Sequence, residues 1–361
     1  MTQQTLKKGR LRKLRHHPLA MISLWVLAAL YMSALFAGFL APYHFDHEDR
    51  AASYAPPTKI RMIDEEGHLR WPFIYKTSFT FDEYYNRVYV EDTTIRYPVR
   101  LLVRGDQYRL FGVFPSRIHL FGVEGDARLY LWGADSRGRD LFSRVLYGGQ
   151  ISLSIGLVGV AISLVIGLTV GGISGYFGGR TDTLLMRVSE ILMVIPGFYL
   201  MLALRSVFSY SLNSVQMYFM IVFIMSFIGW PGIARVVRGM AISLREREFV
   251  LAARTLGVPR MKIIFRHILP HTFSYVVVAA SISVPGYILG ESALSLLGLG
   301  IQDPYASWGN LLSEAMAVSQ IRFHPWVLIP GVFIFLTVMA YNLLGDGLRD
   351  VYDPKRQVVR R

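Results

Sequence analysis

The segment 235–271 places charged side chains directly between two long apolar segments. Two carboxylates, Glu246 and Glu248, are accompanied by eight cationic residues: Arg235, Arg238, Arg245, Arg247, Arg254, Arg260, Lys262 and Arg266. Basic segments beside membrane spans stay in the cytoplasm, so this segment is predicted to be cytoplasmic. The small residues Ala252 and Ala253 would let the surface of another protein approach closely. The chemistry expected here is therefore non-covalent docking.

The same segment predicts a helix, a break and a second helix. Residues 243–255 contain no Gly or Pro. Gly257 can take the left-handed conformation that ends a helix, and Pro259 suits the first turn of the next one. We expect two short helices at a sharp angle, with Ala252 and Ala253 just before the break.

Motifs for other kinds of chemistry are absent from the sequence. A P-loop needs Gly-Lys followed by Ser or Thr, and none of the seven lysines follows a glycine. There is no His-Glu-x-x-His motif, no Gly-x-Ser-x-Gly motif and no cysteine. We therefore expect no catalytic residue, no metal site and no cofactor in this chain.

The docking segment resembles the cytoplasmic EAA loop of permease subunits in ATP-binding-cassette importers. More narrowly, it resembles the C-type permease of the dipeptide and oligopeptide branch, the peptide/nickel family. The matching residues are Glu248-Phe249-Val250-x-Ala252-Ala253-Arg254-x-Leu256-Gly257 and Arg266-His267-Ile268-Leu269-Pro270. Leu251 stands where the family has its acidic residue. The resemblance implies that an ATPase subunit docks on Glu248, Ala252, Ala253, Gly257, Leu269 and Pro270. Because transport against a gradient needs an energy source, it also implies that ATP and magnesium bind to partner subunits.

Four further stretches are similar to the same family. They are WGADSRGRD at 132–140, SALSLLGLG at 292–300, SWGN at 307–310 and NLLGDGLRD at 342–350. Ala134 replaces the Thr that is usual in the first of them. We interpret the charged residues of 132–140 as capping and salt-bridging groups at a helix entry rather than as catalytic groups. The resemblance covers the first span and residues 131–354.

Composition indicates a membrane protein. The 361 residues are 53% hydrophobic and 17% charged, which does not fit an ordinary soluble domain. The net charge is +13, yet 15 acidic and 14 basic residues nearly cancel between positions 42 and 140. The excess positive charge therefore flanks the apolar segments, where it orients a membrane protein. No basic groove for nucleic acid is expected.

Six apolar segments are long enough to suggest membrane spans. They cover residues 19–41, 151–174, 184–208, 217–233, 273–297 and 325–344. The first exceeds the length of a signal-peptide core, so we expect a retained helix. Gly167, Gly171 and Gly175 predict a small-residue stripe for helix packing, and Pro196-Gly197 predicts a kink in the third span.

Ionisable and helix-breaking residues within the spans are candidates for a substrate pathway. Glu190 is one, although pairing with Arg187 one turn away would explain it structurally. Pro285, Gly286 and Glu291 lie in the fifth span, where we expect irregular backbone at mid-membrane depth that faces protein or a watery cavity.

Residues 42–147 are predicted to form a β-rich extracytoplasmic insert. The stretches 87–91 and 97–104 have strand-like composition, with turns expected at Gly105-Asp106, Gly112 and Gly125-Asp126. Two roles stay open for this insert. It either contacts a binding protein or partly covers the pore entrance, or it is a spacer that packs against the membrane surface.

Together these patterns predict an α-helical polytopic membrane protein with six transmembrane helices. The resemblance implies a type I importer permease core. The expected parts are a cytoplasmic N-terminus at 1–18, the first span at 19–41, the insert at 42–147, a core at 148–345 with its coupling loop at 235–271, and a cytoplasmic C-terminus at 346–361.

The resemblance implies a permease for peptides in the bacterial inner membrane. Its expected partners are a second permease, two ATPase subunits, an extracytoplasmic binding protein and membrane lipid. The same architecture could import nickel or another small solute. A membrane-embedded enzyme or assembly scaffold is the alternative from another class, but neither needs the spacing of the docking segment.

Overall fold

The structure is a computed structural model, and it describes residues 14, 17–64, 66–84, 87–207 and 213–352. The basic residues predicted to hold the two termini in the cytoplasm lie mostly outside these ranges. Two compact units can be distinguished. One contains Met1–Leu27, Ser154–Glu291 and Leu336–Arg361, and the other contains Ala28–Leu153 and Ser292–Phe335.

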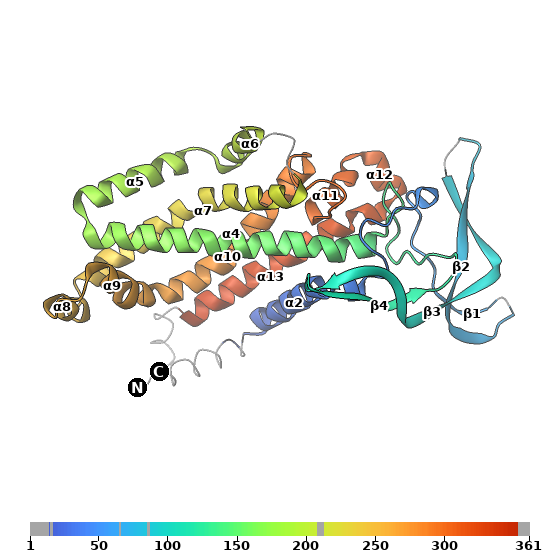
Figure 1. Cartoon of the computed structure of the whole chain (residues 1–361), viewed down its shortest axis with the longest axis horizontal. Coiled ribbons are helices and arrows are strands. Elements are labelled where there is room, and N and C mark those ends of the chain that lie inside the picture. The colour runs from blue at the N-terminus through green and yellow to red at the C-terminus, as the bar shows by residue number, and fades with distance from the viewer. Residues whose placement is uncertain (1–13, 15–16, 65, 85–86, 208–212, 353–361) are drawn as a thin grey trace. The chain divides into compact units, whose positions relative to one another are not determined.

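Five helical segments are long and apolar enough to cross a membrane, and a sixth arises if a bent helix pair is counted as one span. This agrees with the predicted helical membrane protein. The helices involved are α2 (Pro18–Leu35), α4 (Leu141–Phe177), α5 (Gly179–Val194), α6 (Gly197–Val207), α7 (Ser214–Arg245), α10 (Phe273–Leu296) and α13 (Ile329–Tyr352). Figure 1 shows α4 as a long, unbroken ribbon and α6 turned away from α5.

The break between α5 and α6 confirms the kink predicted at Pro196-Gly197. The two helices meet at 87°. Ile195 has an extended backbone (ψ 123°), the conformation favoured before proline because the proline ring clashes with a helical neighbour. The predicted third span is therefore two helices.

The glycine stripe of α4 packs as predicted, and its partner is α7. A Cβ on Gly167 would lie 2.7 Å from the Ile233 side chain, and one on Gly171 would lie 2.5 Å from the Ala234 carbonyl oxygen. Both distances are too short for any larger side chain. The stripe therefore brings the two backbones into direct contact, as small residues do between membrane helices.

The predicted irregularity of the fifth span is wrong. Phe273–Leu296 is one continuous helix with Pro285 in its interior. A proline removes one backbone hydrogen bond, which neighbouring groups in a membrane helix can offset. The irregular backbone lies earlier, where Ile264–Ile268 is a π-helix and Leu269–Thr272 a 3₁₀-helix.

Several helices extend beyond their predicted ends. α4 begins ten residues before the predicted 151, α7 continues to Arg245 instead of 233, and α13 continues to Tyr352 instead of 344. Apolar composition marks only the part of a helix that faces lipid, so polar helical turns beyond it escape detection. The predicted outer loop after α10 also contains helices, α11 (Trp308–Leu312) and α12 (Val318–Phe323).

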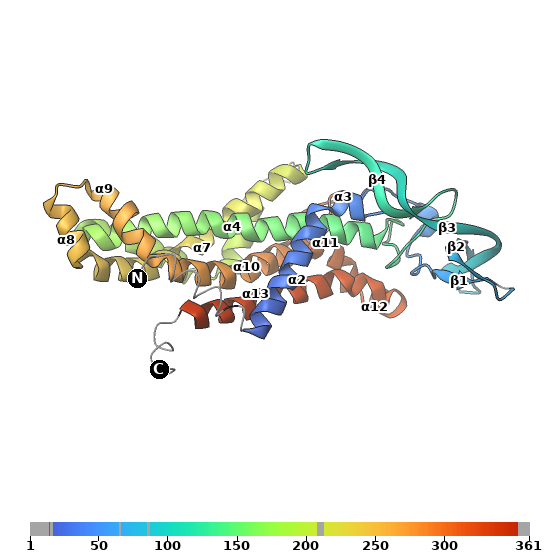
Figure 2. The ribbon, with the colours of Figure 1, turned by 90° about the horizontal axis from the view of Figure 1, so that it is seen from below.

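The insert contains a small antiparallel sheet in the order β1-β2-β3-β4. The strands are β1 (Arg61–Ile63), β2 (Leu69–Phe81), β3 (Arg87–Leu110) and β4 (Phe114–Val123). Figure 2 shows β3 and β4 as a long, curved ribbon. Ile74, Ala127 and Leu129 form a buried cluster beneath it.

Both strand-like stretches of the insert lie in β3. The turn predicted at Gly105-Asp106 is wrong, because the chain runs through it as an irregularity in the β3–β4 register between Arg104 and Tyr108. A bulge bends a strand without reversing it. The turn predicted at Gly112 is confirmed, since it joins β3 to β4.

Candidate functional site

The docking segment begins with α8 (Glu248–Thr255), which ends in a glycine motif. Gly257 has a φ of 71°. Its N–H donates to the Arg254 carbonyl at 3.0 Å, and the Val258 N–H donates to the Ala253 carbonyl at 3.1 Å. This pair of bonds is the Schellman motif, so the prediction for Gly257 is confirmed.

The second helix of the segment differs from the prediction. Pro259 precedes α9 (Arg260–Ile263) as its N-cap. Helical backbone then continues without a break, so Arg260–Leu296 is one apolar segment of 37 residues. Of the two predicted short helices, only α8 is separate, because α9 is the first turn of this long segment. A movement of α8 would therefore act directly on the end of a long membrane helix.

The inner face of α8 is buried within the chain. Val250 and Ala253 pack with Ile263, Ile268 and the α7 residue Ala241. Ala253 is 5% exposed, so it does not itself offer a surface to another protein. Its small side chain lets α8 pack closely on α7 and α9.

The outer face of α8 is exposed. Of the predicted docking residues, Glu248, Ala252, Gly257 and Pro270 are exposed and Leu269 is partly buried. Three apolar residues outside the predicted set are also exposed on this face. They are Phe249, Leu251 and Leu256, of which Leu256 is 82% exposed. Helical spacing relative to buried Val250 and Ala253 could have identified them.

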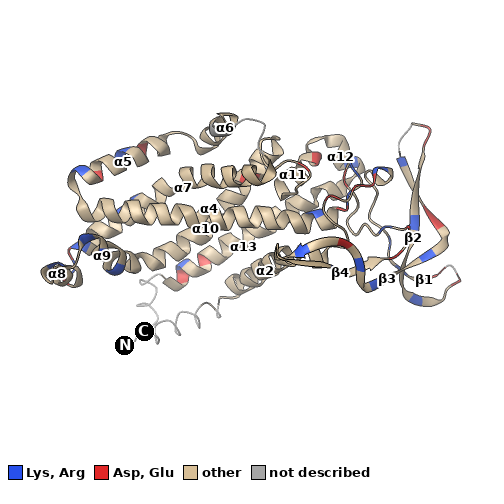
Figure 3. Ribbon diagram, viewed as in Figure 1, with Lys and Arg blue, Asp and Glu red and all other residues tan. Residues whose placement is uncertain are grey.

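An ion pair holds the base of the docking segment. The Arg238 guanidinium on α7 donates through Nε and NH2 to both carboxylate oxygens of Asp182 on α5, at 2.5 and 2.6 Å. Ser174 on α4 also donates to Asp182. A bidentate pair fixes geometry as well as charge. Three helices are thus tied together beside α8, and Figure 3 shows the charged residues gathered on α5, α8 and α9.

The predicted pathway residues are not brought together. Glu190 pairs with Arg187 at 3.1 Å, with both side chains exposed, which confirms the predicted pair. Pro285 and Glu291 are buried, whereas Gly286 is exposed. Gly286 lines a cavity.

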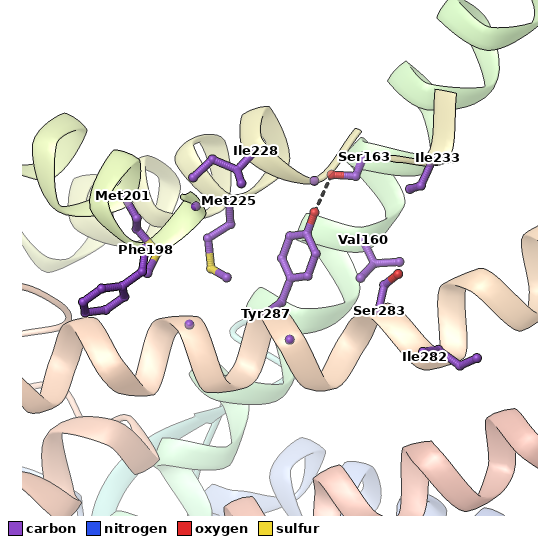
Figure 4. Close-up of a pocket in the computed structure, with 14 residues that line it drawn as sticks. Val160, Ser163, Phe198, Met201, Met225, Ile228, Ile233, Ile282, Ser283 and Tyr287 are labelled. Atoms are coloured by element: carbon purple, nitrogen blue, oxygen red, sulfur yellow. Dashed lines mark hydrogen bonds between the residues drawn. The ribbon is translucent and has the colours of Figure 1, made fainter. Parts of the chain in front are cut away.

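That cavity has a volume of about 420 Å³ and lies between α4, α6, α7 and α10. Its lining is mostly apolar and includes Met201 and Met225. Figure 4 shows Tyr287 reaching across to Ser163, with which it forms a hydrogen bond. A Cβ on Gly229 would lie 2.0 Å from the Tyr287 hydroxyl oxygen. Gly229 therefore makes room for this contact, which no sequence motif marked.

The motif at 132–140 forms an ion network at the start of α4. Arg139 donates to Asp135 at 2.7 Å and to Asp303 at 3.0 Å, and Arg144 donates to Asp303 at 3.1 Å. Arg139 and Arg144 are buried. The structure confirms the predicted salt-bridging role. Asp303 comes from a distant part of the sequence, and the sequence did not predict that it takes part in this network.

Asp140 caps α4 from a fully buried position. Its Oδ2 accepts hydrogen bonds from the Ser143 N–H at 2.8 Å and the Ser143 hydroxyl at 2.6 Å. Burial raises the pKa of the Asp140 carboxyl to about 7, although the bonds from Ser143 act in the opposite direction. The carboxyl is therefore largely protonated in mildly acidic solution.

One group of side chains in the turn between β1 and β2 resembles a metal site by distance alone. Ligand atoms of Asp64, Glu66 and His68 lie within 4.8 Å of one another. However, the Asp64 carboxylate already accepts from Arg70 at 3.1 Å and Arg96 at 2.9 Å. Two arginines neutralise the carboxylate that a cation would need, so we interpret the cluster as structural.

Comparisons with known proteins agree on the family. Residues 167–358 match the model described as "Binding-protein-dependent transport system inner membrane component". Residues 6–57 match "N-terminal TM domain of oligopeptide transport permease C". The sheet lies in the interval between these two matches.

Three curated relatives are named as oligopeptide or dipeptide permeases. The chain is 48% identical over 227 residues to the oligopeptide transport system permease protein OppC of Haemophilus influenzae, covering 63% of this chain and 70% of the relative. It is 39% identical to OppC of Bacillus subtilis, covering 67% and 73%. It is 40% identical to the dipeptide transport system permease protein DppC of Bacillus subtilis, covering 62% and 68%.

In a solved structure titled "Inward facing conformations of the MetNI methionine ABC transporter", one chain is similar to this chain with a TM-score of 0.43 and 20% identity, covering 58% of this chain and 94% of that one. The family match spans more than half of the sequence, from α4 to the end of α13 and beyond. ATP hydrolysis in such systems lies in partner subunits. The chain belongs to the family of binding-protein-dependent transport system inner membrane components, as a C-type permease subunit of an ATP-binding-cassette importer.

Proposed function

We propose that this permease forms, together with a second permease, the path by which peptides enter the cell. The observation that carries this proposal is the similarity to oligopeptide and dipeptide permeases over some two thirds of the chain. Two ATPase subunits would supply energy, and an extracytoplasmic binding protein would deliver the peptide.

The outer face of α8 is the proposed docking surface for an ATPase subunit. It combines Glu248 and Ala252 with three exposed apolar residues, Phe249, Leu251 and Leu256. Exposed apolar residues beside charged ones are typical of protein interfaces. Leu251, at the family's acidic position, would make this contact more apolar than usual.

Force would travel from α8 through its buried face. Val250 and Ala253 pack against α7 and the start of the long helical segment at Arg260. The Asp182–Arg238 pair joins α5 to the same place. Movement of α8 would therefore move α5, α7 and α10 together, which is how a docked ATPase could open the permease alternately to each side.

The cavity of about 420 Å³ is the proposed part of the peptide pathway in this subunit. Its apolar lining and its Ser and Tyr hydroxyl groups suit side chains and the backbone of a peptide. Its lining residues include no His, Asp or Glu, the ligands expected for nickel. The cavity therefore favours peptide over metal cargo, and Gly286 is the predicted pathway residue that it retains.

The proposed orientation places α8 and both termini in the cytoplasm and the sheet outside. It follows from the basic residues around α8 and from the near-neutral insert, by the positive-inside rule. Since the chain has no native cysteine, single cysteines at Thr80 and Gln302 should react with an impermeant thiol reagent from outside. A cysteine at Arg245 should not, and its labelling from outside would reverse the orientation.

Reconstitution of the whole importer in vesicles tests the proposed function. We expect peptide-loaded binding protein to stimulate ATP hydrolysis and uptake of labelled peptide, but not of labelled nickel. Met225→Trp fills the cavity and should reduce peptide uptake. The matched control is Phe223→Trp on the same helix, where the native side chain is 62% exposed. Equal uptake by both variants would exclude the cavity from the pathway.

A further inference from the structure

The tip of the β3–β4 hairpin has an unusual composition for a turn in water. Residues 110–114 are Leu-Phe-Gly-Val-Phe, and Phe111, Val113 and Phe114 are 49%, 70% and 63% exposed. Hairpin turns in water favour Asn, Asp and Gly. An apolar tip with three large exposed side chains indicates that something other than water covers it.

Phe111 also has a strained backbone. Its φ is 54°, in the left-handed region that bulky residues rarely adopt. Such strain persists where the surrounding structure or a function requires it. The following residue, Gly112, has a φ of 73° at no such cost, and a glycine at position 111 would avoid the cost as well. The presence of phenylalanine at position 111 thus indicates that its ring is needed at the tip.

The hairpin is fixed to the end of the first span. The Phe111 ring meets the Phe36 ring edge to face, with 5.5 Å between centroids. Tyr108 lies so close to Gly38 that a Cβ there would be 2.3 Å from the tyrosine ring. Figure 2 shows β4 beside α3 (Ala37–Leu40), which follows α2. The hairpin therefore cannot turn its tip away without losing these contacts.

The position of Phe36, directly after α2, gives the depth of the tip. A helix needs about 20 residues to cross the hydrocarbon core of a bilayer. Counted from Leu19, the first span reaches the outer edge of that core near Gly38. Phe36 and Met32 therefore lie at the level of acyl chains, and so does the tip that contacts Phe36.

A hollow lies between the span and the hairpin. It has a volume of about 620 Å³. Its lining includes Met32 from α2, Phe36 between the two helices, Phe39 and Leu40 from α3, and Leu110 from the hairpin. Met32 and the nearby Leu35 are half exposed, as expected for a helix face in contact with lipid. The hollow continues this lipid-facing surface.

Charges around the tip match a lipid headgroup. Residues 107–123 contain no acidic side chain, and both arginines in this range, Arg109 and Arg117, are exposed. Apolar residues with flanking cations are typical of segments that lie in the membrane interface. We propose that the β3–β4 tip binds an outer-leaflet lipid, whose acyl chain fills the hollow while Arg109 and Arg117 contact its phosphate.

The proposal does not depend on the transported solute. It requires that α2 spans the membrane and that the tip faces lipid rather than protein. It also assigns the sheet a membrane contact of its own, which the similarity to peptide permeases does not include. Failure of peptide uptake in the experiment above would leave it unaffected.

Nitroxide labels test the proposal in the whole importer reconstituted in lipid nanodiscs. Val113→Cys and Phe114→Cys place a label at the tip. Tyr84→Cys is the control, because Tyr84 follows β2 and is 82% exposed. We expect labels at the tip to collide several-fold more with oxygen, which concentrates in lipid, than with a water-soluble nickel chelate. The label at position 84 should show the opposite ratio.

Either of two other results would overturn the proposal. Tip labels that collide mainly with the nickel chelate would place the tip in water. Tip labels shielded from both reagents would place it against protein, such as a second permease. Stimulated ATPase activity, measured for each labelled variant, shows that the labelled importer is assembled.

Discussion

The α8 docking segment and the β3–β4 tip are both short elements that expose large apolar side chains and contain a left-handed residue. They differ in the residue type that adopts the left-handed conformation. At α8 the left-handed position is occupied by Gly257, which closes a Schellman motif, whereas at the tip it is shared by Phe111 and Gly112. Gly257 ends α8 without backbone strain, whereas Phe111 has a strained backbone and places its ring at the tip.

Their surroundings differ in charge as well. Around α8, carboxylates and arginines alternate, which suits the mixed surface of a protein partner. Around the tip there are arginines without acidic residues between positions 107 and 123, which suits lipid phosphates. We infer that the charges beside an exposed apolar group indicate which kind of partner covers it.

The largest expected effect is at Gly257. Gly257→Pro cannot adopt a φ of 71° and loses the N–H that donates to Arg254, so the end of α8 should unfold at a cost of about 3 kcal/mol or more. We expect peptide uptake and stimulated ATP hydrolysis to be lost while the protein stays in the membrane. Gly257→Asn, which tolerates this conformation, is the control. Normal coupled uptake by the proline variant would remove α8 from the coupling mechanism.

A second prediction uses pH to separate the two regions, since Asp140 belongs to the unit that contains the hairpin. Its folded pKa is about 7, against an ordinary value of 3.8. Between these values the folded state holds a proton that the unfolded state has lost. The free energy of unfolding should therefore fall as pH rises from 4 to 7, by roughly 4 kcal/mol at most.

Thermal melts at several pH values check this prediction. Asp140→Asn can still accept the hydrogen bonds from Ser143 and should lack most of the dependence in this range. Asp126→Asn, at a carboxylate that is 84% exposed, should retain it. A melting temperature of the native chain that does not decrease between pH 4 and pH 7 would contradict the raised pKa.

The sequence predicted features that depend on neighbouring residues. Backbone conformation or spacing on one helix was enough to predict three of them: Gly257 at the end of α8, the glycine stripe of α4 and the break at Pro196. The fold class followed from apolar length. The family resemblance also located α8, although it did not show that Ala253 faces inward.

Features that join distant residues could not be predicted in this way. Arg144 and Asp303 are separated by 159 positions and Asp182 and Arg238 by 56, and no local pattern indicates such a pair. The cavity needs four helices, and its key contact depends on the space left by Gly229. Pro285 misled the prediction because a membrane helix can tolerate an interior proline.

A third prediction concerns the attachment of the hairpin at its base. Both ring nitrogens of buried His119 face backbone carbonyl oxygens, those of Ala41 after the first span and of Asp106 in β3. An uncharged imidazole has one N–H and donates to only one of these oxygens. His119→Ala would leave that carbonyl group without its donor, at a cost of about 1–3 kcal/mol if the group stays buried. The sheet should become more sensitive to protease, with little change in ATPase docking. Unchanged protease sensitivity would show that Tyr108 and Phe111 suffice to hold the hairpin.

The smallest effect gives the most direct comparison of the two left-handed positions. Gly257→Ala introduces a Cβ in the left-handed region and should destabilise the chain by about 1–2 kcal/mol, although open space surrounds this position. Phe111→Gly removes the same penalty. It also removes the ring pair with Phe36, worth about 0.5–1.5 kcal/mol beyond the area that the ring buries, together with that burial itself. The losses therefore exceed the gain, so Phe111→Gly should lower the melting temperature in detergent slightly. In lipid nanodiscs the decrease should be larger, because the ring then also loses its contact with acyl chains. An equal decrease in both environments would mean that the Phe111 ring stabilises only through its contacts within the protein, and that lipid does not account for the strain.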